Sequence, residues 1–144
     1  MGIEDIYTEL IAEESRSPEH RRHLDAPTAV LKGRNPSCGD EIALELRVRD
    51  GVVEEAAFTG VGCAISQAST SLMIGLVKGQ PTKKAKALAA TFLRMIKGEI
   101  SEDDPAIEAL GDAAALQGVS QLPARVKCAV LSWRTLAEAL AEKE

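Results

Sequence analysis

The chain has 144 residues and a mass of 15.3 kDa, the size of one domain, and we expect a single domain over residues 1–144. It carries 17 basic and 22 acidic residues, so its net charge is −5, and no dense stripe of Lys or Arg stands out. A phosphate backbone would be repelled, and aromatic stacking platforms are scarce. We therefore expect no nucleic acid partner.

Neither a membrane span nor a secretory signal is predicted. The longest uncharged stretch, residues 56–77, contains three glycines and several Ser and Thr residues, which removes the apolar continuity that lipid demands. The N-terminus is acidic and lacks the basic and apolar regions of a signal peptide. We expect a cytoplasmic protein without membrane contact, whose three cysteines stay reduced and are available for thiol or metal chemistry.

The N-terminal region predicts two helices. Apolar residues at helical spacing indicate an amphipathic helix that ends before Ser15, with Ile3, Ile6, Tyr7, Leu10 and Ile11 on its apolar side. Ser17 followed by Pro18 is typical of a helix start. A short solvated helix is therefore expected to carry His20, Arg21, Arg22 and His23, with both histidines exposed rather than in a metal site.

A β-hairpin is predicted next in the chain. In residues 41–49 the apolar Ile42, Leu44, Leu46 and Val48 alternate with charged residues except at Ala43, as in a half-buried strand. Asp50-Gly51 follows directly and favours a type I′ turn, after which residues 52–59 return to a β-type composition. Residues 26–32 are compatible with an edge strand, which makes a sheet of three strands.

Helices dominate the rest of the chain. We expect one over residues 65–76 that stops at Gly79, and one over residues 83–97 that is closed by Gly98. Beyond an acidic, solvated loop, two short Ala-rich helices precede a last helix that begins at Pro123 and buries Val126, Val130, Trp133, Ala137 and Leu140. The predicted fold class is α+β, with a three-stranded antiparallel sheet packed against several helices.

The hairpin places two cysteines near each other. Around a two-residue turn at positions 50 and 51, Cys38 and Cys63 stand opposite one another at the open end. Glycines nearby allow bulges that shift this pairing by a residue. Asp40 lies two residues after Cys38, on the same face if the strand is regular.

The third cysteine lies in the first turns of the last helix. Cys128 is flanked by Arg125 and Lys127, whose charges predict a lowered pKa for its thiol, as the start of the following helix does for Cys63. Three thiolates and one carboxylate suit tetrahedral zinc, so the set predicts a metal site of Cys38, Asp40, Cys63 and Cys128. The simpler alternative is that Cys63 and Cys128 are ordinary buried thiols.

Three blocks of sequence carry a family resemblance: Asn35-Pro36-Ser37-Cys38-Gly39-Asp40, Gly60-Val61-Gly62-Cys63-Ala64-Ile65-Ser66-Gln67-Ala68-Ser69 and Pro123-Ala124-Arg125-Val126-Lys127-Cys128. They resemble the U-type iron-sulfur cluster assembly family, which includes SufU, IscU and the N-terminal part of NifU. The resemblance implies a fold of the SufE/IscU type and a metal or cluster site at Cys38, Asp40, Cys63 and Cys128. It also implies sulfur delivery by a pyridoxal-phosphate cysteine desulfurase and contacts with other iron-sulfur assembly proteins.

Two features favour the SufU branch of that family. Lys127 stands where the IscU branch has a histidine, and Leu122-Pro123-Ala124-Arg125 replaces its Pro-Pro motif. This likeness implies a zinc-binding sulfur acceptor. Because Arg125 and Lys127 flank Cys128 near the start of the last helix, we expect Cys128 to be the acceptor thiol. The alternatives are an IscU-like scaffold that assembles a [2Fe-2S] cluster, or binds iron, on Cys38, Cys63 and Cys128, and a purely structural zinc module.

Overall fold

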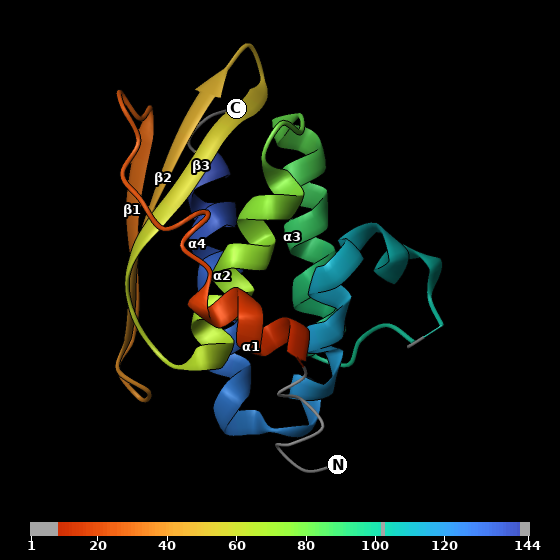
Figure 1. The fold of residues 1–144 in the computed structure, drawn as a ribbon. Coiled ribbons are helices and arrows are strands. Elements are labelled where there is room, and N and C mark those ends of the chain that lie inside the picture. The colour runs from red at the N-terminus through yellow and green to blue at the C-terminus, as the bar shows by residue number, and fades with distance from the viewer. Residues whose placement is uncertain (1–8, 102, 142–144) are drawn as a thin grey trace.

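A three-stranded antiparallel sheet forms one side of the molecule, and helices pack against one of its faces (Figure 1). The computed structural model describes residues 9–101 and 103–141. Strands β1 (Ala29–Asn35), β2 (Asp40–Arg49) and β3 (Val52–Val61) lie side by side in chain order, with β2 in the centre. The helical elements are α1 (Glu9–Arg16), α2 (Ala64–Val77), α3 (Thr82–Ile96), η2 (Pro105–Gln121) and α4 (Pro123–Ala141). The predicted α+β class is confirmed.

The turn between β2 and β3 is the one that the sequence predicts. Asp50 and Gly51 both have positive φ angles, 53° and 74°, as a type I′ turn requires. A β-bulge lies between Arg47 and Val48, so the register shifts by one residue from there to the open end of the hairpin. The paired strands end at Asp40 and Val61, which leaves Cys38 and Cys63 just beyond them.

Helices α2 and α4 form the centre of the helical layer. Eleven of the 14 residues of α2 are buried, among them several polar ones. Trp133 of α4 stacks on Phe92 of α3, with ring centroids 4.1 Å apart, and its indole N–H donates to Oγ of Ser69 on α2 at 2.9 Å. The predicted core position of Trp133 is confirmed, and its one polar atom is satisfied inside the core.

Helices α2 and α3 end next to the glycines that the sequence predicts as their C-terminal caps. Gly79 and Gly98 have φ angles of +83° and +74° directly after α2 and α3, which only glycine adopts without strain. The two short helices expected before Pro123 are the two halves of η2, a 3-10 segment interrupted at Gly111. Among the described residues, none of the helices combines the length and apolar character needed to cross a bilayer.

The N-terminal region differs from its prediction. Helix α1 continues to Arg16 and buries Ile11, whereas Ile3, Ile6 and Tyr7 lie outside the described residues. The helix predicted after Ser17 does not form. Ser17 does accept a hydrogen bond from the N–H of Glu19, but the chain then runs along the edge of β3.

That edge provides backbone partners which a short helix lacks. The N–H of Phe58 donates to the carbonyl of His20, and the N–H of Arg22 donates to the carbonyl of Phe58. The Arg21 guanidinium lies 4.9 Å from the centroid of the Phe58 ring. A two-turn helix at this position would have to form alone, and such short helices are marginal in water. Pairing with the edge of β3 is therefore more stable than the helix.

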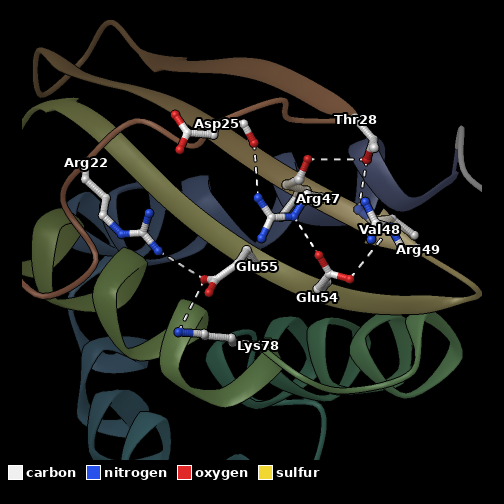
Figure 2. A network of polar contacts seen from close by, with 10 residues as sticks. Arg22, Asp25, Thr28, Arg47, Val48, Arg49, Glu54, Glu55 and Lys78 are labelled. Carbon is white, nitrogen blue, oxygen red and sulfur yellow. Dashed lines mark hydrogen bonds and ion pairs between the residues drawn. The ribbon is translucent and has the colours of Figure 1, made fainter.

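A network of charged residues ties the segment before β1 to β2, β3 and α2 (Figure 2). Arg47 donates to Oε1 of Glu54 at 2.7 Å and to the backbone carbonyl of Asp25 at 3.1 Å. Glu55 pairs with Arg22 at 3.1 Å and with Lys78, just beyond α2, at 3.2 Å. These contacts hold residues 22–28 across the face of the sheet that the helices leave open (Figure 1).

Glu45 is buried, although the alternation along β2 places it on the solvent face. Its carboxylate accepts a hydrogen bond from the N–H of Leu24 at 3.0 Å and lies 2.6 Å from Nδ1 of His23. Burial alone would raise the pKa of Glu45, but the Leu24 N–H and the His23 ring outweigh it, and the pKa is lowered. The covering segment, which comes from elsewhere in the chain, therefore decides the environment of this carboxylate.

Candidate metal centre

Cys38, Asp40 and Cys128 come together at the end of the sheet where β1 turns into β2. Cys38 lies in that turn, Asp40 begins β2, and Cys128 lies in the second turn of α4. One ligand atom from each, the two sulfurs and a carboxylate oxygen, all lie within 4.8 Å of one another. The sulfur of Cys128 is 3.0 Å from that of Cys38, although 90 positions separate them in the chain.

Cys63 stands beside this group as the N-cap of α2. Its backbone N–H donates to Oδ1 of Asp40 at 2.9 Å, and its sulfur accepts a long hydrogen bond, 3.5 Å, from the N–H of Ser66. The Cys63 thiol also contributes to the electrostatic environment of Cys128. The hairpin pairing expected for Cys38 and Cys63 does not occur within the strands; the start of α2 and the carboxylate of Asp40 position Cys63 instead.

Asn35, the last residue of β1, is a site residue that the sequence reasoning did not single out. Its side-chain amide is buried and donates to Oδ2 of Asp40 at 3.3 Å, and it lies 3.8 Å from the sulfur of Cys128. The two oxygens of Asp40 are thus held by Asn35 and by Cys63. The sequence feature that could have identified Asn35 is its position three residues before Cys38, within the first of the three motif blocks.

The thiol of Cys128 has a raised pKa, which contradicts the expected lowering by Arg125 and Lys127. The side chain of Cys128 is 0% exposed, and this burial is the largest cause of the rise, followed by contacts with Cys38, Asp40 and Cys63. Lys127 points to solvent, as its exposure shows. Without metal, Cys128 is therefore a neutral thiol at physiological pH.

The donor set fits a thiophilic metal. All three cysteines are free thiols, and thiolate ligands with one carboxylate suit zinc or iron-sulfur chemistry far better than magnesium or calcium. A bound cation would instead lower the pKa of the Cys128 thiol, because a thiol that coordinates a metal ion is deprotonated. Within residues 9–101 and 103–141, no second group of three such ligands comes together.

The histidines lie away from this centre, as expected, but only one of them is exposed. His23 points largely to solvent and contacts Glu45. The ring of His20 is 13% exposed, with Nε2 4.0 Å from a carboxylate oxygen of Glu19, and it faces Gly75 of α2. The expectation of a solvated side chain is therefore wrong for His20, because its segment runs along the sheet edge and is not a free helix.

The surface next to the centre is open and basic. A groove of about 800 Å³ begins at the turn that carries Asn35 and Ser37 and runs along α4. Its lining includes no acidic side chain but four exposed cations, Arg34, Lys97, Lys127 and Arg134.

The chain is a small α+β domain that groups two thiols and one carboxylate at the end of its sheet, with a third thiol beside them. The chain belongs to the family of the NifU-like N terminal domain, whose model matches residues 6–140.

Relatives and solved structures agree with this membership. The chain is 39% identical to the zinc-dependent sulfurtransferase SufU of Bacillus subtilis, over 99% of this chain and 95% of that protein. It is 41% identical to the iron-sulfur cluster assembly scaffold protein IscU of Thermotoga maritima, over 97% and 96% of the two chains. The crystal structure of a putative iron-sulfur cluster assembly scaffold protein for the SUF system from Fervidobacterium islandicum superposes with a TM-score of 0.88 at 34% identity, covering 96% of this chain and 99% of that one.

Proposed function

We propose that this protein is a zinc-binding sulfur carrier in iron-sulfur cluster assembly, which accepts persulfide sulfur from a pyridoxal-phosphate cysteine desulfurase. The observation that carries the proposal is the cluster of Cys38, Asp40 and Cys128, with Cys63 beside it. The likeness to a protein named as a zinc-dependent sulfurtransferase, over nearly the whole of both chains, supports it. The carrier works in the reducing cytoplasm, where its thiols stay free.

The metal ligands in this proposal are Cys38, Asp40, Cys63 and Cys128. When zinc is bound, it keeps coordinating thiols deprotonated and so provides a thiolate at neutral pH. Asn35 and the N–H of Cys63 hold the carboxylate of Asp40 in place, as in other metal sites in which outer hydrogen bonds orient the ligands. The hard carboxylate is the most exchangeable ligand of this set.

Cys128 is the proposed sulfur acceptor. Its thiolate attacks the outer sulfur of the donor's cysteine persulfide; a new S–S bond forms at Cys128, the S–S bond of the donor breaks, and the donor cysteine leaves as a thiolate. One S–S bond replaces another and the transferred sulfur keeps its oxidation state, so no further oxidant or reductant is needed. Because Cys128 is buried behind Cys38, the donor must approach through the exposed turn at residues 36–39.

A second candidate is a scaffold that assembles a [2Fe-2S] cluster on Cys38, Cys63 and Cys128. The likeness to proteins named as IscU scaffolds favours it, since one of them is 41% identical. In that case iron and sulfide are the cargo, other assembly proteins are the partners, and the same thiols bind the cargo. Lys127 in place of histidine, and the Leu122-Pro123-Ala124-Arg125 sequence, argue for the carrier.

Mass spectrometry separates these functions. The zinc-loaded protein is incubated with a cysteine desulfurase and cysteine, alkylated and digested, with Cys128→Ser as the matched control. We expect an adduct of one sulfur atom on the Cys128 peptide of the parent protein. An adduct on Cys38 or Cys63 and never on Cys128 refutes the acceptor assignment. No adduct on any cysteine refutes the carrier, and anaerobic reconstitution then tests for a [2Fe-2S] absorption spectrum as opposed to a purely structural zinc site.

A further inference from the structure

Two polar side chains at the start of α2 are buried beside Asp40 without a hydrogen-bond partner. Gln67 is 6% exposed and Ser66 is 1% exposed. Neither end of the Gln67 amide nor the Oγ of Ser66 reaches a partner among the described residues. Orphaned buried polar atoms are rare in native proteins and each costs stability, so a cluster of three at one place requires an explanation.

Gly62 shows where these atoms lie. A Cβ built on Gly62 would lie 2.7 Å from Oδ1 of Asp40, 3.2 Å from Nε2 of Gln67 and 3.2 Å from Oγ of Ser66. The carboxylate oxygen and the two orphaned groups therefore surround one small space, which exists because residue 62 has no side chain. Nε2 of Gln67 and Oγ of Ser66 are both hydrogen-bond donors, and the carboxylate of Asp40 is the acceptor among these three neighbours of Gly62.

In the orientation described, Asp40 does not use these donors. Its Oδ1 accepts from the N–H of Cys63 and its Oδ2 from Asn35, and this keeps an oxygen within reach of the two thiols. A turn of the carboxylate toward Gly62 exchanges these partners for Gln67 and Ser66. The start of α2 favours a negative charge in that place too, because its first N–H groups form the positive end of the helix dipole.

We propose that Gln67 and Ser66 are positioning residues that hold the carboxylate of Asp40 in a second orientation, turned away from the thiols. The inference rests on the proposed metal site and deepens it. In one orientation Asp40 completes the donor set with the cysteines. In the other orientation the Asp40 carboxylate accepts hydrogen bonds from Gln67 and Ser66. A position at the metal would then be open for a ligand from a partner. The unpartnered atoms of Gln67 and Ser66 thus lower the stability of the protein while Asp40 faces the thiols, and they stabilise the orientation in which Asp40 is turned away.

The experiment measures zinc release to an excess of a coloured chelator, together with the melting temperature of the metal-free protein. Gln67→Leu keeps the volume of the side chain and removes its amide. Ser132→Ala is the matched control, because Ser132 Oγ on α4 is also buried without a partner but is not among the groups around Gly62. No desulfurase is present, so the result does not depend on whether the protein accepts sulfur.

If Gln67 is a positioning residue, its replacement raises the melting temperature and lowers the rate of zinc release. If it only packs, its replacement does not slow zinc release. We expect Gln67→Leu and Ser132→Ala both to melt at a higher temperature than the parent protein, since each loses orphaned polar atoms. Only Gln67→Leu should release zinc more slowly, by about tenfold, because the turned carboxylate loses a hydrogen bond to a charged group. Release as fast as in the parent overturns the proposal, and so does faster release with a lower melting temperature.

A second measurement follows the Gln67 amide directly. In 15N-labelled, zinc-loaded protein, the side-chain NH2 signal of Gln67 should shift when imidazole is added as an external ligand, as the amide gains its carboxylate partner. In Asp40→Asn, whose side chain carries no charge, the same signal should stay in place. A Gln67 signal that responds equally in both proteins overturns the proposal.

Discussion

Replacing Asn35 by leucine tests whether the centre is held together by the carboxylate of Asp40. Asn35→Leu removes the donor to Oδ2 of Asp40 and the contact with Cys128 Sγ while keeping the number and branching of the side-chain heavy atoms, so no cavity forms. Asp40 is 2% exposed, so water does not readily replace the lost donor. A hydrogen bond to a buried charged group contributes about 1.5–3 kcal/mol.

The expected loss for the metal-free protein is about 2 kcal/mol, which for a chain of this size lowers the melting temperature by roughly 4–8 °C. With zinc bound, the carboxylate has a metal partner, and the loss should fall to less than half. Thermal unfolding followed by circular dichroism, with and without zinc, measures both values.

A double-mutant cycle with Asp40→Asn isolates the pair. If the amide acts through the charge of Asp40, the two changes together should cost about 1–2 kcal/mol less than the sum of the single changes. Equal losses with and without zinc, or a coupling energy below about 0.5 kcal/mol, would refute the reasoning, because Asn35 would then act only by packing at the end of β1.

Three further outcomes are expected. Removing zinc should lower the melting temperature, because the ligands join the β1–β2 turn to α2 and α4; an unchanged melting temperature in a metal-free preparation would contradict this. Asp40→Cys should bind zinc as tightly as the parent or more tightly in chelator competition, yet lose most desulfurase-dependent alanine release; normal stimulation would leave Asp40 a purely structural ligand. The pKa of Glu45 is lowered in the folded protein, so its carboxylate stabilises the fold above the ordinary pKa of 4.5, and this stability is lost as pH falls through the pKa of the folded state. Glu45→Gln should therefore flatten the acid side of the pH profile of urea unfolding. A profile parallel to that of the parent protein would show that Glu45 is not the titrating group.

Local sequence patterns were enough to predict most of the strands and helices. The apolar and charged alternation within residues 41–49 and the Asp50-Gly51 turn predicted the β2–β3 hairpin, and the helical spacing that stops at Gly79 and Gly98 predicted α2 and α3 to within about two residues. These features are decided by neighbours in the chain: side-chain periodicity selects the secondary structure, and glycine or Asp-Gly permits the positive φ angles of the turns and caps. The three cysteines and Asp40 were also recognisable as one set, from their sequence blocks.

The burial and the pKa values of those residues depend on contacts between distant parts of the chain. The contact between Cys38 and Cys128 joins segments 90 positions apart, and the burial it brings raises the pKa of Cys128, where neighbouring Arg125 and Lys127 predicted the reverse. Residues 20–22 pair with the edge of β3 rather than forming a helix, and Glu45 is covered by a segment from elsewhere in the chain. Burial and hydrogen bonding depend on which surfaces meet, and local sequence does not carry that information. For the same reason, the orphaned amide of Gln67 beside Asp40 becomes visible only when the start of α2 is placed against the start of β2.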